Sequence, residues 1–159
     1  SDKQDFIDRL VDEDINRAVA EMLSTYTTQL ETAIDLNEEH DLVTLRKVIL
    51  HWCDLLLTNK PMALIGIIDL LKNAKNRKLQ LLTLAAVNAF FEDIMHAKIG
   101  IERDFTYTDL KGNIEKYANQ LSLNKVMTMY DQITEAHKKL MQNVNPTLVF
   151  EQIVIKGVS

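Results

Sequence analysis

The sequence predicts an all-α fold, a helical bundle preceded by one or two short helices. Apolar residues recur at alternating steps of three and four along most of the chain, which is the period of one helix face. The 159 residues contain only four glycines and two prolines, too few turn-forming residues for an all-β domain with many hairpins. Hydrophobic residues make up 47% and charged residues 26% of the chain, a balance typical of a globular domain with its own core.

The first forty residues are expected to hold short helices. Residues 2–10 form a short and weakly amphipathic segment. The acidic residues 12–14 then suit the start of a helix, because negative charge is favourable near a helix N-terminus. This helix would carry an apolar stripe made of Ile15, Ala18, Val19, Met22, Leu23 and Tyr26. Thr28 and Glu31 have the spacing of a capping box, which predicts a further helix that ends near Leu36.

Three longer helices are predicted in the middle of the chain. Asp41 is expected to cap the first, and the sequence Asn59-Lys60-Pro61 to end it and begin the next. The second helix, residues 62–73, is apolar almost throughout, so we expect it to be largely buried. The third, residues 77–99, is the predicted central helix of the bundle, and Gly100 suits its end.

A loop over residues 102–107 separates these helices from the last part of the chain. Thr106 or Thr108 is expected to cap a helix that runs to about Asn119. Ser122 stands at the N-cap position of a long helix. The apolar stripe of this long helix consists of Leu123, Val126, Tyr130, Ile133, His137, Leu140 and Val144.

The final segment begins with Asn145 as a cap and Pro146 in the first turn of a helix. Its apolar residues cover most of the helix circumference rather than a single stripe. They are Leu148, Val149, Phe150, Ile153, Val154 and Ile155. Such a helix must be covered on more than one side, so either it fills the centre of its own bundle or another chain covers part of it. A β-strand is the weaker alternative, because residues 153–155 are all β-branched.

A resemblance to a known family rests on residues 135–155, which read EAHKKLMQNVNPTLVFEQIVI. This segment resembles the end of the delta-prime subunit of bacterial DNA polymerase III, and most of all its form in low-GC Gram-positive bacteria. Members of that family close with a helix that reads roughly A-x-x-x-L-x-x-N-V-N-P-x-L, followed by an apolar helix. The resemblance is most specific over the last 35 residues or so and extends more weakly back to about Asp41.

The resemblance implies a division of the chain and a role for it. Residues 1–37 would be the end of a lid domain with its connecting helices, and residues 38–159 a helical collar domain. The collar would hold clamp-loader subunits together while sliding clamps are loaded, and would meet DNA only indirectly, through the assembled complex. The family's ATPase-like module would lie upstream. Relatives often carry an Arg-Asp pair on the central helix, where this chain has Glu92 and Asp93.

The six apolar residues of the final helix are our candidate subunit interface, and its partners would be the other clamp-loader subunits. We predict no catalytic residue, cofactor or metal site. The chain has no G-x-x-x-x-G-K-[ST] sequence with which to hold a nucleotide. Its net charge of -5 argues against a nucleic-acid surface. The best basic run is Lys72, Lys75, Arg77 and Lys78, for which a solvated helix end is the simpler interpretation.

Isolated polar residues favour structural roles. Asp93 and His96 lie three residues apart, as the ligands of di-metal bundles do, but no second copy exists, so we expect an ordinary helix-surface pair. His137 is expected to be a hydrogen-bonded histidine at a packing seam. Cys53 is expected to be a small core residue, and Trp52, Phe90 and Phe91 should also belong to the core.

A single cysteine, the lack of a signal-peptide pattern and the lack of a membrane-spanning stretch predict a cytoplasmic chain. Two alternatives to the collar domain remain open. One is a helical protein–protein interaction or regulatory module unrelated to replication, whose terminal helix docks in a partner's groove. The other is a small helical enzyme or ligand-binding protein, which would require a deep pocket with converging polar groups.

Overall fold

A computed structural model describes residues 2–101 and 105–157 of the chain. Within these ranges it contains α-helices, one short 3-10 turn and no β-strand. The predicted all-α helical bundle is therefore confirmed. The elements are α1 (Asp2–Asp12), α2 (Arg17–Ser24), α3 (Leu30–Glu39), α4 (Leu42–Thr58), α5 (Lys60–Asn73), α6 (Arg77–Ile99), η2 (Thr108–Leu110), α7 (Lys111–Gln120), α8 (Leu123–Met141) and α9 (Pro146–Lys156).

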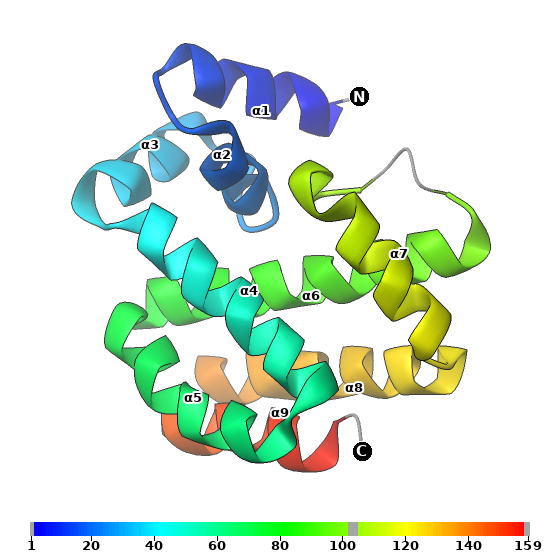
Figure 1. The fold of residues 1–159 in the computed structure, drawn as a ribbon. Helices are drawn as coiled ribbons and strands as arrows, with labels where there is room; N and C mark the ends of the chain where they lie inside the picture. The colour runs from blue at the N-terminus through cyan, green and yellow to red at the C-terminus, as the bar shows by residue number, and fades with distance from the viewer. Residues whose placement is uncertain (1, 102–104, 158–159) are drawn as a thin grey trace.

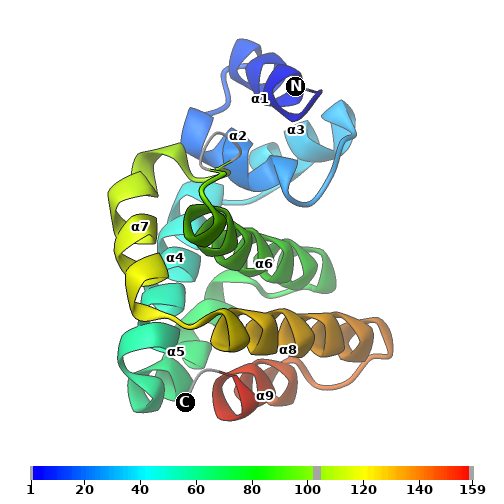
Figure 2. The same cartoon turned by 90° about the vertical axis from the view of Figure 1, so that its right-hand side faces the viewer.

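The helices are arranged along one long axis of the molecule (Figure 1). The short helices α1, α2 and α3 gather at one end, while α5, α8 and α9 lie at the other. Helices α4 and α6 lie between these groups, and α7 covers their side (Figure 2). Because α6 contacts α2, α4, α7 and α8, it is the central helix that the sequence predicted.

The core is built around α6, which buries side chains on nearly every side. Phe90 and Phe91 meet edge to face, with ring centroids 5.4 Å apart. The Phe90 ring also meets Tyr117 of α7 at 5.7 Å. A helix with neighbours on several sides must be apolar on several sides, which explains why α6 shows no single stripe.

Most helix ends lie where the sequence placed them, because the caps act locally. An Asp41 carboxylate oxygen accepts from the Thr44 amide at 3.0 Å. The side chains of Asn59, Ser122 and Asn145 accept in the same way at the starts of α5, α8 and α9. Gly100 ends α6 with a φ of 80°, in the left-handed region that glycine adopts at no steric cost.

The predicted starts of α2 and α3 are wrong. Helix α1 runs to Asp12, so the acidic residues 12–14 follow one helix rather than begin the next. Asn16 caps α2 instead, and its side-chain oxygen accepts from the Val19 amide at 3.2 Å. Thr28 forms no capping box: the residue before α3 is Gln29, whose amide donates to the Thr27 hydroxyl at 3.0 Å. Local cap spacing was therefore overridden by the turn that precedes each helix.

The predicted cap of α7 is also wrong. Residues 102–104 of the expected loop lie outside the described residues. The chain then forms η2, and the residue before α7 is Leu110, which makes no side-chain capping bond. Thr106 and Thr108 have tertiary partners instead, described below.

The two C-terminal helices differ in how well their faces were predicted. Helix α8 buries Val126, Met129, Ile133, Ala136 and Leu140. The predicted stripe is thus rotated, because Leu123 and His137 are exposed. The structure shows no hydrogen bond from His137 to a described residue, so its predicted seam role is wrong. Residues 146–156 are helical, which excludes the β-strand alternative.

Candidate functional site

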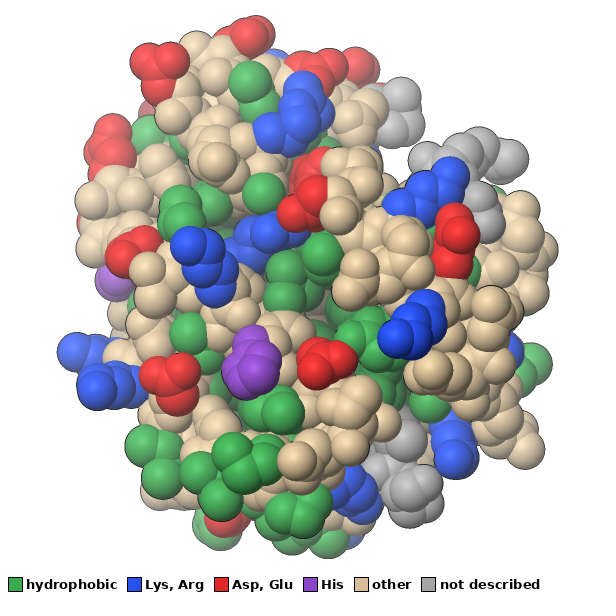
Figure 3. Space-filling model, in the orientation of Figure 1, with side chains coloured by type: hydrophobic (Ala, Val, Ile, Leu, Met, Phe, Trp, Pro, Cys, Tyr) green, Lys and Arg blue, Asp and Glu red, His purple; other side chains and the backbone are tan. Residues whose placement is uncertain are grey.

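Helix α5 presents a row of large apolar side chains to the surface. Its Ile68 is 74% exposed, Ile65 59% and Met62 44%. In Figure 3 apolar side chains gather over the region where Figure 1 places α5. The expectation that residues 62–73 are largely buried is therefore wrong. The physical reason is that α5 lies at the end of the molecule, where α4 and α9 are its main neighbours and leave its outer side uncovered.

The exposed side of α5 and the adjacent side of α4 enclose a groove of about 350 Å³. We call it the α4–α5 groove. It is lined by Val48, His51, Trp52 and Leu55 from α4, and by Met62, Ile65, Gly66, Ile68, Asp69 and Lys72 from α5. Most of the surface in this groove is apolar. The ionisable side chains among its lining residues are those of His51, Asp69 and Lys72.

Trp52 and Gly66 shape the inner side of the groove. The indole Nε1 donates to the Ala63 carbonyl oxygen at 2.9 Å, which fixes the ring between α4 and α5. The ring also meets Phe150 of α9 edge to face, with centroids 5.7 Å apart. A Cβ atom at position 66 would lie 3.4 Å from Cδ1 of Trp52. Glycine at this position therefore keeps the groove hollow above a rigid, core-packed indole.

The candidate interface on α9 is divided between core and surface. Val149, Phe150, Ile153 and Val154 are buried, at 1% exposure or less. Leu148 and Ile155 are exposed, at 55% and 57%. These two lie seven residues apart and therefore share one face of the helix. The buried four face α5 and α8, which are the main neighbours of α9.

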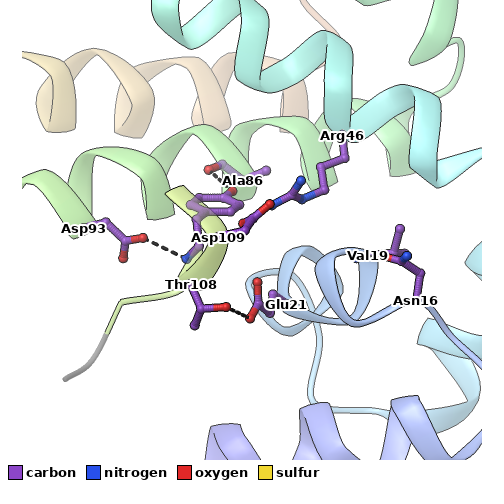
Figure 4. A network of polar contacts seen from close by, with 9 residues as sticks. Asn16, Val19, Glu21, Arg46, Ala86, Asp93, Thr108 and Asp109 are labelled. Atoms are coloured by element: carbon purple, nitrogen blue, oxygen red, sulfur yellow. Dashed lines mark hydrogen bonds and ion pairs between the residues drawn. The ribbon is translucent and has the colours of Figure 1, made fainter. Parts of the chain in front are cut away.

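A second feature is a polar cluster where η2 meets α2, α4 and α6 (Figure 4). The Thr108 hydroxyl donates to the Glu21 carboxylate at 2.6 Å. Arg46 forms an ion pair with Asp109 at 2.7 Å, and its guanidinium lies 5.7 Å from the centre of the Tyr107 ring. The cluster thus connects the N-terminal helices to the rest of the bundle.

Asp93 anchors the segment before η2. Its two carboxylate oxygens accept from the backbone amides of Thr106 and Tyr107 at 2.8 and 2.9 Å. The Tyr107 hydroxyl in turn donates to the Ala86 carbonyl oxygen at 2.6 Å. The Lys3 ammonium of α1 donates to the Thr106 hydroxyl, also at 2.6 Å. Side chains and backbone of α6 and the Lys3 side chain of α1 therefore hold this segment together.

Burial shifts the acid–base behaviour of this cluster. Glu21 is 2% exposed and Asp93 1%. Desolvation raises the pKa of Glu21 above its usual value, against the opposing hydrogen bond from Thr108. Desolvation likewise raises the pKa of Asp93, although two backbone amides counteract it. Both carboxylates are engaged by donors, so the arrangement suits a structural joint.

The predictions for isolated polar and aromatic residues are confirmed in part. Asp93 is buried, so the prediction of a helix-surface pair with His96 is wrong for the aspartate. No group of three or more potential metal ligands occurs among the described residues. Cys53 is buried, and burial raises the pKa of its thiol. Trp52, Phe90 and Phe91 belong to the core, as predicted. The basic residues of the run from Lys72 to Lys78 are exposed.

Sequence reasoning missed the α4–α5 groove. The available signal was the one applied to α9, namely a short helix that is apolar over most of its circumference. Residues 62–71 show it equally well. Gly66 within that helix was a second signal, because an interior glycine costs helix stability and usually has a packing reason.

An uncovered apolar groove on an all-α domain is typical of helical domains that bind other proteins. The comparisons with known proteins show the family. The chain belongs to the family described as "DNA polymerase III, delta subunit, C terminal", whose model matches residues 56–157. The predicted resemblance to this polymerase is thereby confirmed.

A curated relative supports the same assignment. The chain is 26% identical over 149 residues to "DNA polymerase III subunit delta'" of Bacillus subtilis (strain 168), covering 93% of this chain. It spans 45% of the length of that relative. No solved structure matches the chain. Among the described helices, none is both long and apolar enough to cross a membrane.

Proposed function

We propose that this chain is the C-terminal oligomerisation region, or collar, of a clamp-loader delta-prime subunit. In this role it holds the loader subunits together while sliding clamps are placed on DNA. The family match over residues 56–157 supports the proposal, and the delta-prime relative supports the choice of subunit. The observation that carries the oligomerisation role is the exposed apolar surface of α5, because large uncovered apolar surfaces mark sites of protein association.

The proposed division of the chain follows the same assignment. Residues 1–37 are the end of the lid domain with its connecting helices, and residues 38–159 are the collar. The cap at Asp41 begins the first long helix, close to this boundary. In this division the hydrogen bond between Glu21 and Thr108 joins the two parts.

The proposed role is not catalytic. The partners are the other clamp-loader subunits, DNA is met only through the assembled complex, and the place of action is the cytoplasm. The negative net charge of the chain supports an indirect relation to DNA. The exposed Leu148 and Ile155 of α9 are a proposed part of the subunit interface, backed by the four buried residues of that helix.

The experiment is reconstitution with purified subunits. The chain is mixed with the other clamp-loader subunits from the same bacterium and examined by size-exclusion chromatography with light scattering. We expect it to elute within a hetero-oligomer, whereas an unrelated helical domain of similar mass elutes alone. A folded chain that joins none of these subunits would contradict the proposal and favour an interaction module unrelated to replication.

A further inference from the structure

We infer that the α4–α5 groove receives an amphipathic helix of a neighbouring loader subunit, with apolar residues along one side and acidic residues at one end. The inference rests on the proposed function and deepens it, because it assigns a docking surface outside α9 and the chemistry of what that surface binds. Three properties of the groove support it: its dimensions, the backbone of its walls, and the charge at one end.

The dimensions suit a helix. The exposed side of α5 from Met62 to Lys72 covers ten residue steps, or about 15 Å at the rise of an α-helix. That length holds about three turns of a partner helix. Met62, Ile65 and Ile68 follow one another at steps of three, so their side chains form a ridge along α5. Val48 and Leu55 form the facing wall on α4, seven residues apart.

The backbone of the walls favours a helix over an extended peptide. Both walls are interior turns of α-helices, in which amide and carbonyl groups already bond to each other. An extended segment in the groove would lose water from its own backbone groups and find no backbone partner there. A helix satisfies those groups internally and can present only side chains to the groove.

The charge at one end selects an acidic partner. Lys72 lines the groove, and Lys75, Arg77 and Lys78 follow it without an intervening carboxylate. None of the four forms an ion pair with a carboxylate in the described part of the chain. Arg77 and Lys78 border a different hollow together with Glu39, so Lys72 is the cation that lines the groove and Lys75 follows it three positions later.

The carboxylate in the groove is that of Asp69, which keeps its negative charge and, among the described residues, contacts only a neutral amide. An amide nitrogen of Asn73 contacts a carboxylate oxygen of Asp69 at 3.4 Å and donates to the Asp69 carbonyl oxygen at 2.9 Å. Lys72 and Lys75 outnumber this one carboxylate, so the chain carries excess positive charge at the C-terminal end of α5, beside the apolar bed of the groove. Acidic residues at one end of the partner helix complement that charge.

The test measures binding of the purified loader subunits to the immobilised chain. Two double variants change the groove: Ile65→Asp with Ile68→Asp removes the apolar bed, and Lys72→Glu with Lys75→Glu reverses the charge. Val43→Asp on α4 is the matched apolar control, since Val43 is 47% exposed and does not line the groove. Lys116→Glu on the exposed side of α7 is the charge control. Thermal unfolding checks that each variant keeps its fold.

We expect the apolar variant to weaken binding about 100-fold, mainly through faster dissociation. The charge variant should slow association about 10-fold at low ionic strength, and this difference should shrink as salt is added. Both controls should bind as the unchanged chain does. This pattern would support the inference and the proposed function together.

Other outcomes separate the two ideas. If the unchanged chain binds and both groove variants bind equally well, the collar proposal stands and the groove inference is overturned. If only the apolar variant weakens binding, the acidic partner helix is overturned. If the unchanged chain binds no loader subunit, the proposed function fails and the inference fails with it. Self-association that is lost in the apolar variant would identify a second copy as the occupant and overturn the inference.

Discussion

The Thr108 hydroxyl donates to the Glu21 carboxylate at 2.6 Å, although the two residues lie 87 positions apart. This bond joins α2 to η2, and it is accompanied by the Arg46–Asp109 ion pair at 2.7 Å. It therefore connects the N-terminal helices to the bundle through the buried Glu21 carboxylate and the exposed Thr108 hydroxyl. Two predictions concern this joint.

Replacing Thr108 by Val should destabilise the protein by about 1.5–3 kcal/mol at neutral pH, because a buried charged group loses its hydrogen-bond donor. The measurement is the free energy of unfolding in urea. The cost should be smaller at acidic pH, where Glu21 is protonated and its uncharged form needs the donor less. Thr128→Val on α8 is the control, because the Thr128 hydroxyl donates only to a backbone carbonyl of its own helix. Equal losses for both variants would contradict the proposed role of the joint.

Glu21→Gln tests the pH dependence of the same site. Because burial raises the pKa of Glu21 in the folded state, the folded state binds more protons than the unfolded state as pH rises past the usual glutamate value. Folding stability contributed by this group therefore falls with increasing pH in that window. The Gln variant lacks this titration. The melting temperature of the variant minus that of the unchanged protein should therefore increase as pH rises from about 4.5 to 7. Parallel pH profiles would contradict the raised pKa.

Gly66→Ala should separate stability from binding. Alanine in a helix interior is more favourable than glycine by about 0.5–1 kcal/mol, and the new Cβ would lie 3.4 Å from Trp52, in van der Waals contact. We therefore expect a slightly higher melting temperature. Binding of loader subunits should be weaker, because the methyl group begins to fill the groove. Gly112→Ala on α7, where a Cβ meets nothing within 4 Å, is the control and should leave binding unchanged. Unchanged binding by Gly66→Ala would contradict a role for the hollow in docking.

The sequence predicted where helices begin and end better than it predicted the contacts between helices, for a physical reason. Asp41, Ser122 and Asn145 cap their own helices within three residues, so their effect is readable locally. The contact between Glu21 and Thr108 depends on how distant helices pack, and no local pattern encodes it. Thr108, one of the two residues predicted to cap α7, is instead a tertiary donor.

The same distinction explains the error on α5. Apolarity around a helix predicts that something covers it, but it does not say whether the cover belongs to the same chain. The apolar pattern of residues 62–73 predicts burial within the chain, whereas Ile65 and Ile68 are exposed. For α9 the sequence is consistent with both possibilities. The structure divides its six apolar residues between core and surface, and the predicted interface remains a prediction.

Alanine substitutions along α9 should fall into two classes. Phe150 is fully buried and its ring meets Trp52, so Phe150→Ala should cost about 3–5 kcal/mol of folding stability. Leu148 and Ile155 are more than half exposed, so their removal should leave the melting temperature nearly unchanged. If this face also meets a neighbouring subunit, Leu148→Ala and Ile155→Ala should weaken assembly in the reconstitution assay without affecting the fold. Exposed Met141 of α8 provides the matched control, and Met141→Ala should change neither property. Normal assembly by both exposed variants would confine the role of α9 to the core and leave the α4–α5 groove as the candidate docking surface.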